Sequence, residues 1–515
     1  MGFLSLLFGQ RSAPTPAPPT RNSLNQRGYA GSSAGFPKST DFGRLESSWS
    51  GMPYTADAYI YQHWRTLVAR SRAGCEEFDH LRKYKQMVRD NVAGPDGFTL
   101  HAQPKDPTGK LDKLAAKAIE DAWNEWSKRG NYDSTGTMSR ADGERLAVTT
   151  RAVDGEFIAI KRYGELGGPW GFCLQFVDPM LLDNTHYVKL SNGNHIRHGI
   201  EFDQTTGRPV AYYFREFDEM LMGYMVYSRG ADQYNRIPAD RVIHWFVPEI
   251  LGQKRGLPQT RTALWRMRML AGFHDAALTN ARVSAAKMGV ISDPEFENSD
   301  EDELPTDAEA GTFMNIGNRT LTKFDSNFPN GETEVFERGM LRSAASSLSV
   351  SYNNLASDLT AVNFSSIRQG ALDERETWKG DQESFISGVE IPVYESWLEY
   401  SLLAQKITVN GKPLKFERLE KYKSVEFSGR RWAWIDPVAD MNAAVTAIGQ
   451  GIRSVSSVIE ETTGREAADV WDEMKDDKEE MKKRGIVPLI PPGSAPPMRP
   501  AGQETAAHEQ PPVKP

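Results

Sequence analysis

The chain has 515 residues, of which 39% are hydrophobic and 25% are charged, and its 61 Lys and Arg against 69 Asp and Glu give a net charge of −8. This length allows about three domains, and the negative charge argues against a protein that grips nucleic acid over its whole surface, because such binding neutralises phosphates. Cys75 and Cys173 are the only cysteines, which excludes a disulfide framework and a four-cysteine zinc site and favours a reducing, cytosolic setting.

Both ends of the chain lack a hydrophobic period. Residues 1 to 45 and 487 to 515 are rich in Pro, Ser, Gly and Ala, so we expect them to be flexible. No segment has the roughly 18 consecutive apolar residues of a membrane helix. The apolar opening MGFLSLLFG follows no basic residue, so we predict neither a signal peptide nor a membrane span.

Two helical patterns come first. Apolar residues recur at helical spacing from Ala56 to Asn91, in a stretch that is also basic. A second amphipathic helix is predicted over 111–126. Its expected buried side consists of Leu114, Ile119, Trp123 and Trp126.

Residues 145 to 250 change to a period of two. Turn signals such as SNGNH and QTTGRP separate the strand-like segments. We therefore expect an antiparallel block with helical inserts. Its predicted strands start at Phe157 and cover 171–177, 198–202, 210–214 and 242–246.

The pattern returns to a long helix over 256–289, with His274 on its apolar stripe and therefore predicted to be packed. An acidic run without Lys or Arg follows over 293–309. Helices are expected next over 335–355 and 366–404, the second kinked at Pro392, because proline removes a backbone hydrogen bond.

Helices also fill the C-terminal part. Asp436 and Pro437 form a helix start, and an apolar stripe follows at Met441, Val445, Ile448 and Ile452. Gly464 is expected to end the next helix. A last helix over 466–484 has acids early and basic residues late, as the helix dipole favours.

Motifs of known catalytic chemistry are absent from the sequence. There is no G-x-x-x-x-G-K-[ST] phosphate loop, no G-x-G-x-x-G after a strand and no H-E-x-x-H. GSSAG at 31–35 fits G-x-S-x-G by letter, but Ser33 lacks the strand, turn and helix that a nucleophile elbow requires. We interpret this match as chance.

Three weaker patterns leave alternatives open. Asp154 and Glu156 are alternate residues at the start of a predicted strand, so their side chains would share one face of it. There they could act as a general acid and base, although a polar turn that leads into the strand explains both residues as well. His195 and His198 have an i, i+3 spacing that suits a metal, although turn histidines are usually solvated. The acidic run over 293–309 could bind a divalent cation, but a solvated or docking surface is the simpler interpretation.

Several segments, in this order, resemble the lambda-type family of phage portal proteins over residues 50 to 485. The most specific set is RIPADRVIHWF (236–246), GQKRGLPQTRTAL (252–264) and, far downstream, NFSSIRQGALDE (363–374), in which Phe364 stands where the family often has Tyr. The remaining segments are RSR (70–72), DNVAGPDGFTL (90–100), DGEFIAI (154–160), GIEFDQTTGRPVAYYF (199–214), DAALTNARVSAAKMGVI (275–291), VYESWL (393–398), WIDPVADMNAA (434–444), AIGQGIRSVSSVIEETTG (447–464) and EMKKRGI (480–486).

The resemblance implies a non-enzymatic virion protein, assembled in the host cytoplasm. It would form a homo-oligomeric ring, typically dodecameric, at one capsid vertex. Double-stranded DNA would pass through the ring non-specifically during packaging and ejection. The implied partners are the large terminase subunit, the major capsid or scaffold protein, and head-completion or tail-connector proteins. No cofactor, metal or membrane is implied.

The resemblance also implies an α+β portal-type fold with a strand-rich wing, long stem helices, a small α/β clip and a helical crown. The expected parts are a flexible arm (1–50), the wing (51–250), a stem helix (251–291), the clip (292–335), a second stem helix with the channel loop (336–365), a kinked helix returning to the wing (366–430), the crown (431–486) and a disordered tail (487–515).

Two groups of site residues follow from this assignment. The candidates for the channel loop are Asp358, Thr360, Asn363, Ser365 and Arg368. The candidates for docking the motor on the clip are Glu295, Glu297, Asp300, Glu301, Asp302 and Glu303.

Two other classes of function stay open at this stage. One is a carboxylate-based hydrolase with a strand-rich catalytic domain, which would use Asp154. The other is a monomeric scaffolding module that binds partners through its flexible ends. A closed ring with a central hole distinguishes the portal hypothesis from both.

Overall fold

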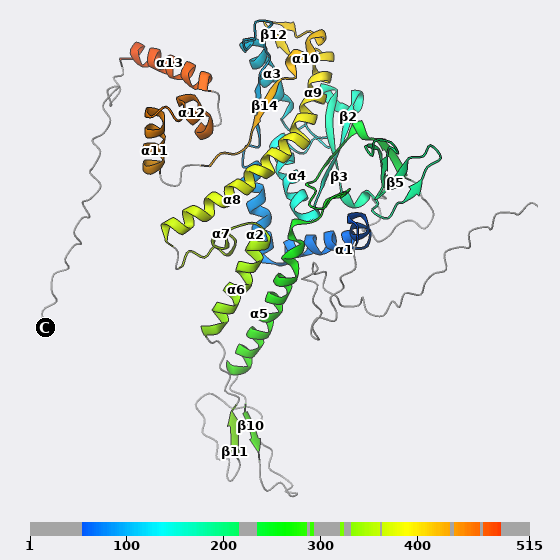
Figure 1. The fold of residues 1–515 in the computed structure, drawn as a ribbon, viewed down its shortest axis with the longest axis vertical. Helices are drawn as coiled ribbons and strands as arrows, with labels where there is room; N and C mark the ends of the chain where they lie inside the picture. The colour runs from blue at the N-terminus through cyan, green and yellow to red at the C-terminus, as the bar shows by residue number, and fades with distance from the viewer. Residues whose placement is uncertain are drawn as a thin grey trace, which may run out of the picture. The chain divides into compact units, whose positions relative to one another are not determined.

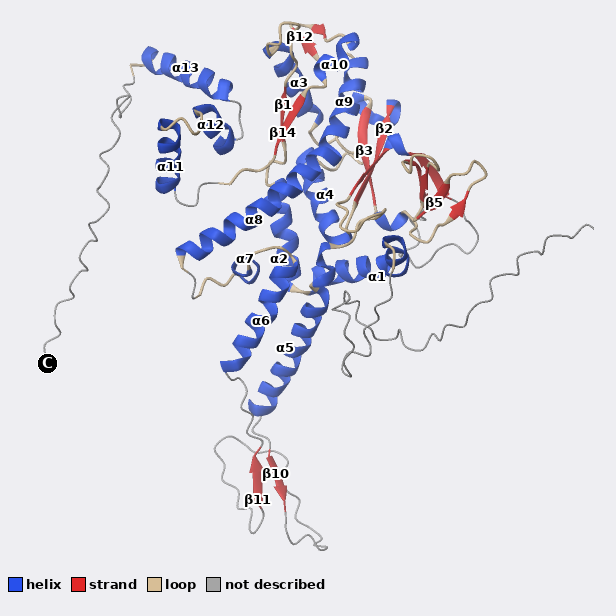
Figure 2. Ribbon diagram, in the orientation of Figure 1, coloured by secondary structure: helices blue, strands red, loops and turns tan. Residues whose placement is uncertain are grey.

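The structure is a computed structural model that describes residues 54–215, 234–285, 289–292, 320–323, 331–360, 363–432, 437–463 and 467–485. The chain forms two units, one up to Arg430 and one from Arg431 onward. Helices and small antiparallel sheets make up the first unit, and helices make up the second (Figures 1 and 2). This confirms the α+β class.

The predicted N-terminal helix is present but broken. It forms α1 (Ala56–Glu77) and α2 (Asp79–Val88), and Phe78 between them has an extended backbone. Thr55 caps α1 by accepting a hydrogen bond from the Ala58 amide. Trp64 and its apolar neighbours on α1 pack against Leu257, close to the predicted stem.

An aromatic cluster holds the next elements together. Helix α3 (Lys113–Trp126) buries Trp123 and Trp126 as predicted, and these rings contact Trp397 of a later helix. The prediction for Leu114 was wrong, since 64% of it is exposed. At 100° per residue, position 114 lies on the opposite side of the helix from Trp123.

Small two-stranded sheets flank this cluster. Their strands are β1 (Thr99–Ala102) with β14 (Val425–Ser428), and β12 (Thr408–Val409) with β13 (Lys412–Pro413), and the short helix α10 is Leu419–Tyr422.

Helix α4 (Arg140–Asp154) was not predicted and occupies the start of the expected strand block. Several of its buried residues are polar, which hides the apolar period: Arg140, Glu144, Thr149, Arg151 and Asp154. These groups have partners within unit 1, for example Arg151 with Asp381 at 2.7 Å. A capping box of Ser139 and Asp142 begins the helix.

The strands that follow form two antiparallel sheets, as predicted. The three-stranded sheet has the order β3-β2-β9 and the five-stranded sheet the order β4-β5-β6-β7-β8. Ile158 and Ile160 of β2 share one apolar core with Ile200 and Phe214 of the larger sheet. The strands are β2 (Phe157–Tyr163), β3 (Phe172–Val177), β4 (Val188–Lys189), β5 (His195–Arg197), β6 (Ile200–Phe202), β7 (Pro209–Arg215), β8 (Tyr234–Pro238) and β9 (Val242–Trp245).

Two helices, α5 (Leu264–Ala285) and α6 (Gly331–Ser347), run side by side (Figure 1). The predicted helix over 256–289 therefore begins later than expected, because Pro258 and a 3-10 turn at Gln259–Thr262 precede it. Between α5 and α6 the strands β10 (Gly289–Ser292) and β11 (Thr320–Lys323) pair antiparallel.

The helix predicted over 335–355 ends early and is followed by the short α7 (Tyr352–Ala356). The helix predicted over 366–404 is divided into α8 (Phe364–Phe385), a π-turn (Ile386–Glu390) and α9 (Ile391–Leu403). The predicted interruption is confirmed, and it takes the form of this π-turn immediately before Pro392, across which Ile391 donates to Ile386.

The second unit contains α11 (Pro437–Gly449), α12 (Val455–Thr463) and α13 (Ala467–Lys483). These agree with the predicted C-terminal helices, whereas Asp436 and Gly464 lie outside the described residues. In the described part of the chain, no helix combines the length and apolar character needed to cross a membrane.

Candidate functional site

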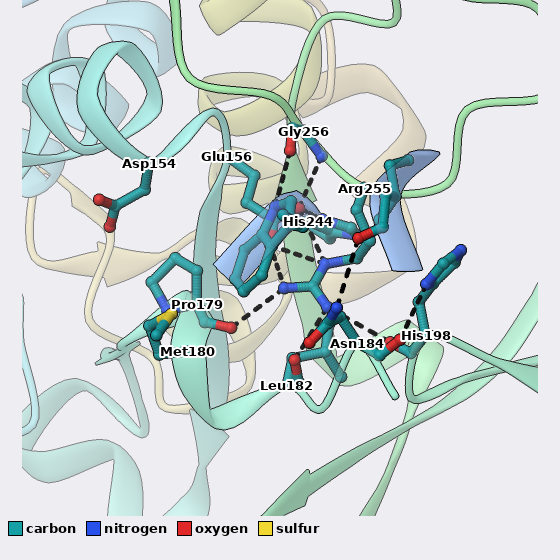
Figure 3. Close-up of polar contacts among 12 residues, drawn as sticks. Asp154, Glu156, Pro179, Met180, Leu182, Asn184, His198, His244, Arg255 and Gly256 are labelled. Atoms are coloured by element: carbon teal, nitrogen blue, oxygen red, sulfur yellow. Dashed lines mark hydrogen bonds and ion pairs between the residues drawn. The ribbon is translucent and has the colours of Figure 1, made fainter. Parts of the chain in front are cut away.

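Three of the sequence motifs meet at one place, which we call the stem joint: residues 70–72, 154–156 and 253–260. It connects α1, the end of α4, strand β2 and the segment that leads into α5. Figure 3 shows its centre around Glu156 and Arg255. The sequence showed these motifs as separate segments, and their contacts explain why those residue types are present.

Arg255 and Glu156 form an ion pair at the centre of the stem joint, and both side chains are fully buried. The guanidinium Nε lies 2.7 Å from Glu156 Oε1, and its other nitrogens donate to the carbonyl oxygens of Leu182 (2.8 Å) and Pro179 (3.1 Å). Glu156 also accepts from the Gly256 amide at 2.7 Å and contacts His244 Nε2 at 3.0 Å (Figure 3). Both charges are therefore compensated by groups of the protein.

The same contacts control the pKa of Glu156. Burial alone would raise it, but the attraction of Arg255 and the contact with His244 outweigh burial and lower the pKa of Glu156 to about 2. The carboxylate thus stays charged at every physiological pH.

Two glycines let the backbones approach closely at the stem joint. Gly155 ends α4 in the left-handed region at φ 94°, and a Cβ at Gly256 would overlap the carbonyl oxygen of Gly155. The Trp64 indole donates to the Gly256 carbonyl at 2.8 Å, and the Arg255 guanidinium lies 4.2 Å from the centre of the Trp64 ring.

The RSR motif makes the remaining contacts of the stem joint. Ser71 and Thr260 share a hydrogen bond of 2.6 Å. Arg72 bridges two carboxylates, with its Nε 2.8 Å from Asp154 Oδ1 and its Nη1 3.1 Å from Asp178 Oδ2. Although burial opposes the charge of Arg72, these two carboxylates raise the pKa of its guanidinium.

The prediction that Asp154 and Glu156 share a strand face was wrong. Asp154 is the last residue of α4, and the turn at Gly155 directs the two carboxylates to different partners (Figure 3). Burial raises the pKa of Asp154, and Arg72 opposes this rise. Both carboxylates are engaged in ion pairs, so this geometry does not form a general acid and base pair.

The histidine pair also has a structural role. His198 is buried at φ 52°, and its ring contacts the Asn184 carbonyl oxygen and the Tyr187 hydroxyl. His195 lies on β5, with its ring near Phe202. Among the described residues, no group of three or more potential ligands is arranged to hold a metal ion.

The predicted channel loop begins after α7, and Asp358 determines its local structure. The carboxylate accepts from the Tyr352 hydroxyl at 2.7 Å and from the Thr360 amide at 2.8 Å, and Arg338 Nε lies 3.8 Å away. Hydrogen bonds from Thr360 and then from Tyr352 lower the pKa of Asp358 to about 2. Asp358 therefore holds the loop together and does not present a free carboxylate.

The other loop candidates divide into two groups. Thr360 and Asn363 are exposed, and Leu359 between Asp358 and Thr360 is 68% exposed. Arg368 lies in the first turns of α8 and is partly buried, whereas the side chain of Ser365 lies outside the described residues.

Glu374 lies on α8 and contacts the segment before the loop; the sequence did not single it out by function, although it ends the NFSSIRQGALDE motif. It is 7% exposed, and its Oε2 accepts from the Ser351 amide at 3.0 Å and from Asn354 Nδ2 at 2.9 Å. Its Oε1 accepts from the Trp378 indole at 3.2 Å. Glu374 thus attaches the segment before the loop to α8.

The candidates on the predicted clip, Glu295, Glu297, Asp300, Glu301, Asp302 and Glu303, all lie outside the described residues. On α5, the prediction for His274 was wrong. Its side chain is 47% exposed and lies 3.3 Å from Glu337 of α6, so it belongs to the polar surface between the two helices.

Comparisons with known proteins agree with the resemblance seen in the sequence. The family described as "Phage portal protein, lambda family" matches residues 42–382. The chain is 32% identical over 457 residues to the probable portal protein of Halomonas phage phiHAP-1, with 86% of each chain covered. It is 22% identical to portal protein B of Escherichia phage lambda, covering 91% of this chain and 92% of that one.

Among solved structures, the chain is similar to one from the neck of an empty GTA particle. The TM-score is 0.42 at 14% identity, and the match covers 80% of this chain and 95% of the other.

Because the stem joint depends on a buried charge pair, removing either partner should be costly. We expect Glu156→Gln or Arg255→Met each to lower the free energy of unfolding by about 3–5 kcal/mol, since each leaves a buried group uncompensated. In a double-mutant cycle measured by urea unfolding, the Glu156→Gln/Arg255→Met double variant should lose about 2–3 kcal/mol less free energy of unfolding than the two single variants lose together. The exposed pair Glu125 and Lys128 provides the control, with a coupling under about 1 kcal/mol; equal couplings would contradict the account.

The lowered pKa of Glu156 also predicts a dependence on pH. A carboxyl whose folded pKa lies below its unfolded value of about 4.3 stabilises the fold above that value and loses this contribution as the pH falls. The difference in urea midpoint between the wild type and Glu156→Gln should thus stay constant from neutral pH to mildly acidic pH and narrow as the pH falls toward 2. The exposed Glu417→Gln is the control, and a difference that does not change with pH would disprove this role.

The role of Glu374 can be tested by hydrogen exchange. Glu374→Gln loses the charged acceptor of three hydrogen bonds, so amides 351–360 should exchange about ten-fold faster. Glu376→Gln is the matched control, because Glu376 lies on the same helix but pairs only at the surface with Lys379. Unchanged exchange in Glu374→Gln would show that the loop does not depend on this carboxylate.

Proposed function

Because this chain belongs to the lambda family of phage portal proteins, we propose that copies of it close into a ring through contacts between their stem helices and that the ring is a conduit for double-stranded DNA. Membership in this family makes the chain a structural component of the virion at the portal vertex and not an enzyme. Rings are the assembled form of this family; the subunit number of twelve, the contact surface and the partners are our proposals.

The observation that carries the proposal is an exposed stripe on α5, which we call the stem stripe: Trp265, Met269, Gly272 and Ala276. Their spacing of i, i+4, i+7 and i+11 places them on one side of the helix, and all four are exposed, with Trp265 at 57% and Met269 at 50%. This side therefore has no cover within the described part of the single chain.

The stem stripe has the shape of a helix-packing surface. Two large apolar side chains occupy its first half, and two small residues occupy its second half, where an added Cβ at Gly272 would meet nothing within 4 Å. Small residues let another helix approach closely. On α6, Val335 is 72% exposed and Phe336 50% exposed, so a neighbouring copy would find apolar surface on both stem helices.

The channel loop suits contact with DNA without capture. Each cation that neutralises a phosphate adds salt-dependent affinity. The described tip of the loop presents the uncharged residues Leu359, Thr360 and Asn363, while the carboxylate of Asp358 is occupied by internal hydrogen bonds. Such a loop can touch a duplex that slides past without retaining it.

The remaining parts are proposed by their position along the chain. The acidic segment over 293–309 would dock the large terminase subunit by complementing a basic surface, which mainly accelerates association. The strand block would be the wing, and α11 to α13 the crown. Head-completion or tail-connector proteins would bind after packaging, and the major capsid or scaffold protein would surround the ring.

The stem stripe generates a test of ring closure. Trp265→Glu places a charge in the proposed contact between copies, so it should abolish rings in negative-stain images and shift the protein to monomers in mass photometry. Leu166→Glu is the matched control, because Leu166 is 71% exposed at the turn between β2 and β3, outside the stem. Rings with Trp265→Glu as abundant as in the control would contradict the proposed contact.

A further inference from the structure

The C-terminal unit has almost no core of its own. In the described residues of 437–463 and 467–485, the buried side chains are those of Ala444 and Ala467, which are 9% and 4% exposed. An independently folded domain buries much more apolar surface than two alanines supply. The unit therefore requires apolar contacts beyond those that its described residues make with one another.

An apolar surface runs along α11 and past its end, and we call it the crown stripe: Val438, Met441, Val445 and Ile448 on the helix, and Ile452 three residues after it. Val438 is 72% exposed, Val445 60% and Ile452 73%, although this pattern is the one that a core-facing helix has. The helix has a single charged residue, Asp440. It is therefore poorly suited to stand in water on all sides.

A Schellman motif ends α11 just before Ile452. Gly451, at φ 71°, and the hydrogen bond of 2.9 Å from the Ile452 amide to the Ala447 carbonyl form a Schellman motif. In such a motif the residue at the position of Ile452 commonly contacts the residue at the position of Ala447.

The third helix of the unit provides a surface that complements the crown stripe. Along its length α13 is rich in charged residues, but three large apolar side chains remain exposed: Trp471 at 46%, Met474 at 49% and Met481 at 40%. Each copy therefore carries two different apolar surfaces. Two unlike surfaces on one chain are the requirement for a head-to-tail contact that closes into a ring.

We infer that the crown stripe of one subunit packs against the C-terminal unit of the neighbouring subunit, so that this unit acquires its core only when the ring closes. This inference rests on the proposed ring. DNA does not fit the crown stripe, because its five residues include no cation to neutralise phosphate. A second copy does, because the ring would hold identical units next to one another at high local concentration.

Folding of the crown would then be coupled to assembly. The three helices have 13, 9 and 17 residues, and isolated helices of such lengths are marginal in water. In an unassembled chain they should open and close freely, and in the ring they should become protected.

Hydrogen exchange of the full chain tests the inference, with monomers and purified rings compared in the same buffer. We expect amides of 437–449 to exchange at least about ten-fold more slowly in rings than in monomers. Val445→Glu should still form rings through the stem, yet its 437–449 amides should exchange as fast as in monomers. Ala443→Glu is the matched control, because Ala443 is exposed on the opposite side of α11, and it should keep the protection.

The other outcomes overturn the inference in distinguishable ways. Equal protection in monomers and rings would mean that the unit's own chain covers the crown stripe. Protection that appears only after DNA is added would assign the stripe to DNA, and identical exchange in Val445→Glu and Ala443→Glu would remove the stripe from the contact. If the wild type forms no rings at all, the proposed function fails, and this inference falls with it.

Discussion

The ion pair between Glu156 and Arg255 is the interaction on which the arrangement of the first unit depends. Neither side chain reaches water, and around them lie the end of α4, the start of β2, the segments at Pro179 and Leu182, and the residues that lead into α5. A buried pair of this kind adds little stability compared with a well-packed apolar contact, but it strongly disfavours any arrangement that separates the two charges. It therefore specifies how the strand block is joined to α5.

The neighbouring contacts act in the same direction. Gly155 and Gly256 allow their two backbone segments to come into contact. The Trp64 indole donates a hydrogen bond to the Gly256 carbonyl, and its ring packs against the Arg255 guanidinium. The contacts between copies that we propose along α5 require the start of this helix to be held in a fixed position. The loop after α7 shows the same principle on a smaller scale, since Glu374 and Asp358 use buried or internal hydrogen bonds to shape a tip that is itself uncharged and exposed.

Much of the fold could be predicted from the sequence, because periodicity reports burial on one side of an element. The alternation from Phe157 onward and over 210–214 predicted β2 and β7, and Pro392 predicted the interruption between α8 and α9. Helix α4 escaped prediction because half of its buried side is polar and its partners, such as Asp381, lie far along the chain. For the same reason the roles of Arg255 and Glu374 could not be read from their neighbours. Met441, Val445 and Ile448 lie on one helix as predicted, whereas Ile452 lies after its end. The spacing of these residues does not say which chain covers them.

The proposed function follows from the apolar surfaces that a single chain leaves exposed. The stem stripe and the crown stripe are both apolar, and within its own unit each leaves most of its residues exposed. A cryo-EM reconstruction of the purified full-length chain tests this account most directly. It predicts a closed ring with an axial opening wide enough for duplex DNA and with the Trp265 ring buried against the neighbouring subunit. A reconstruction in which the chain stays a single particle, or forms a ring with Trp265 facing solvent, would contradict it.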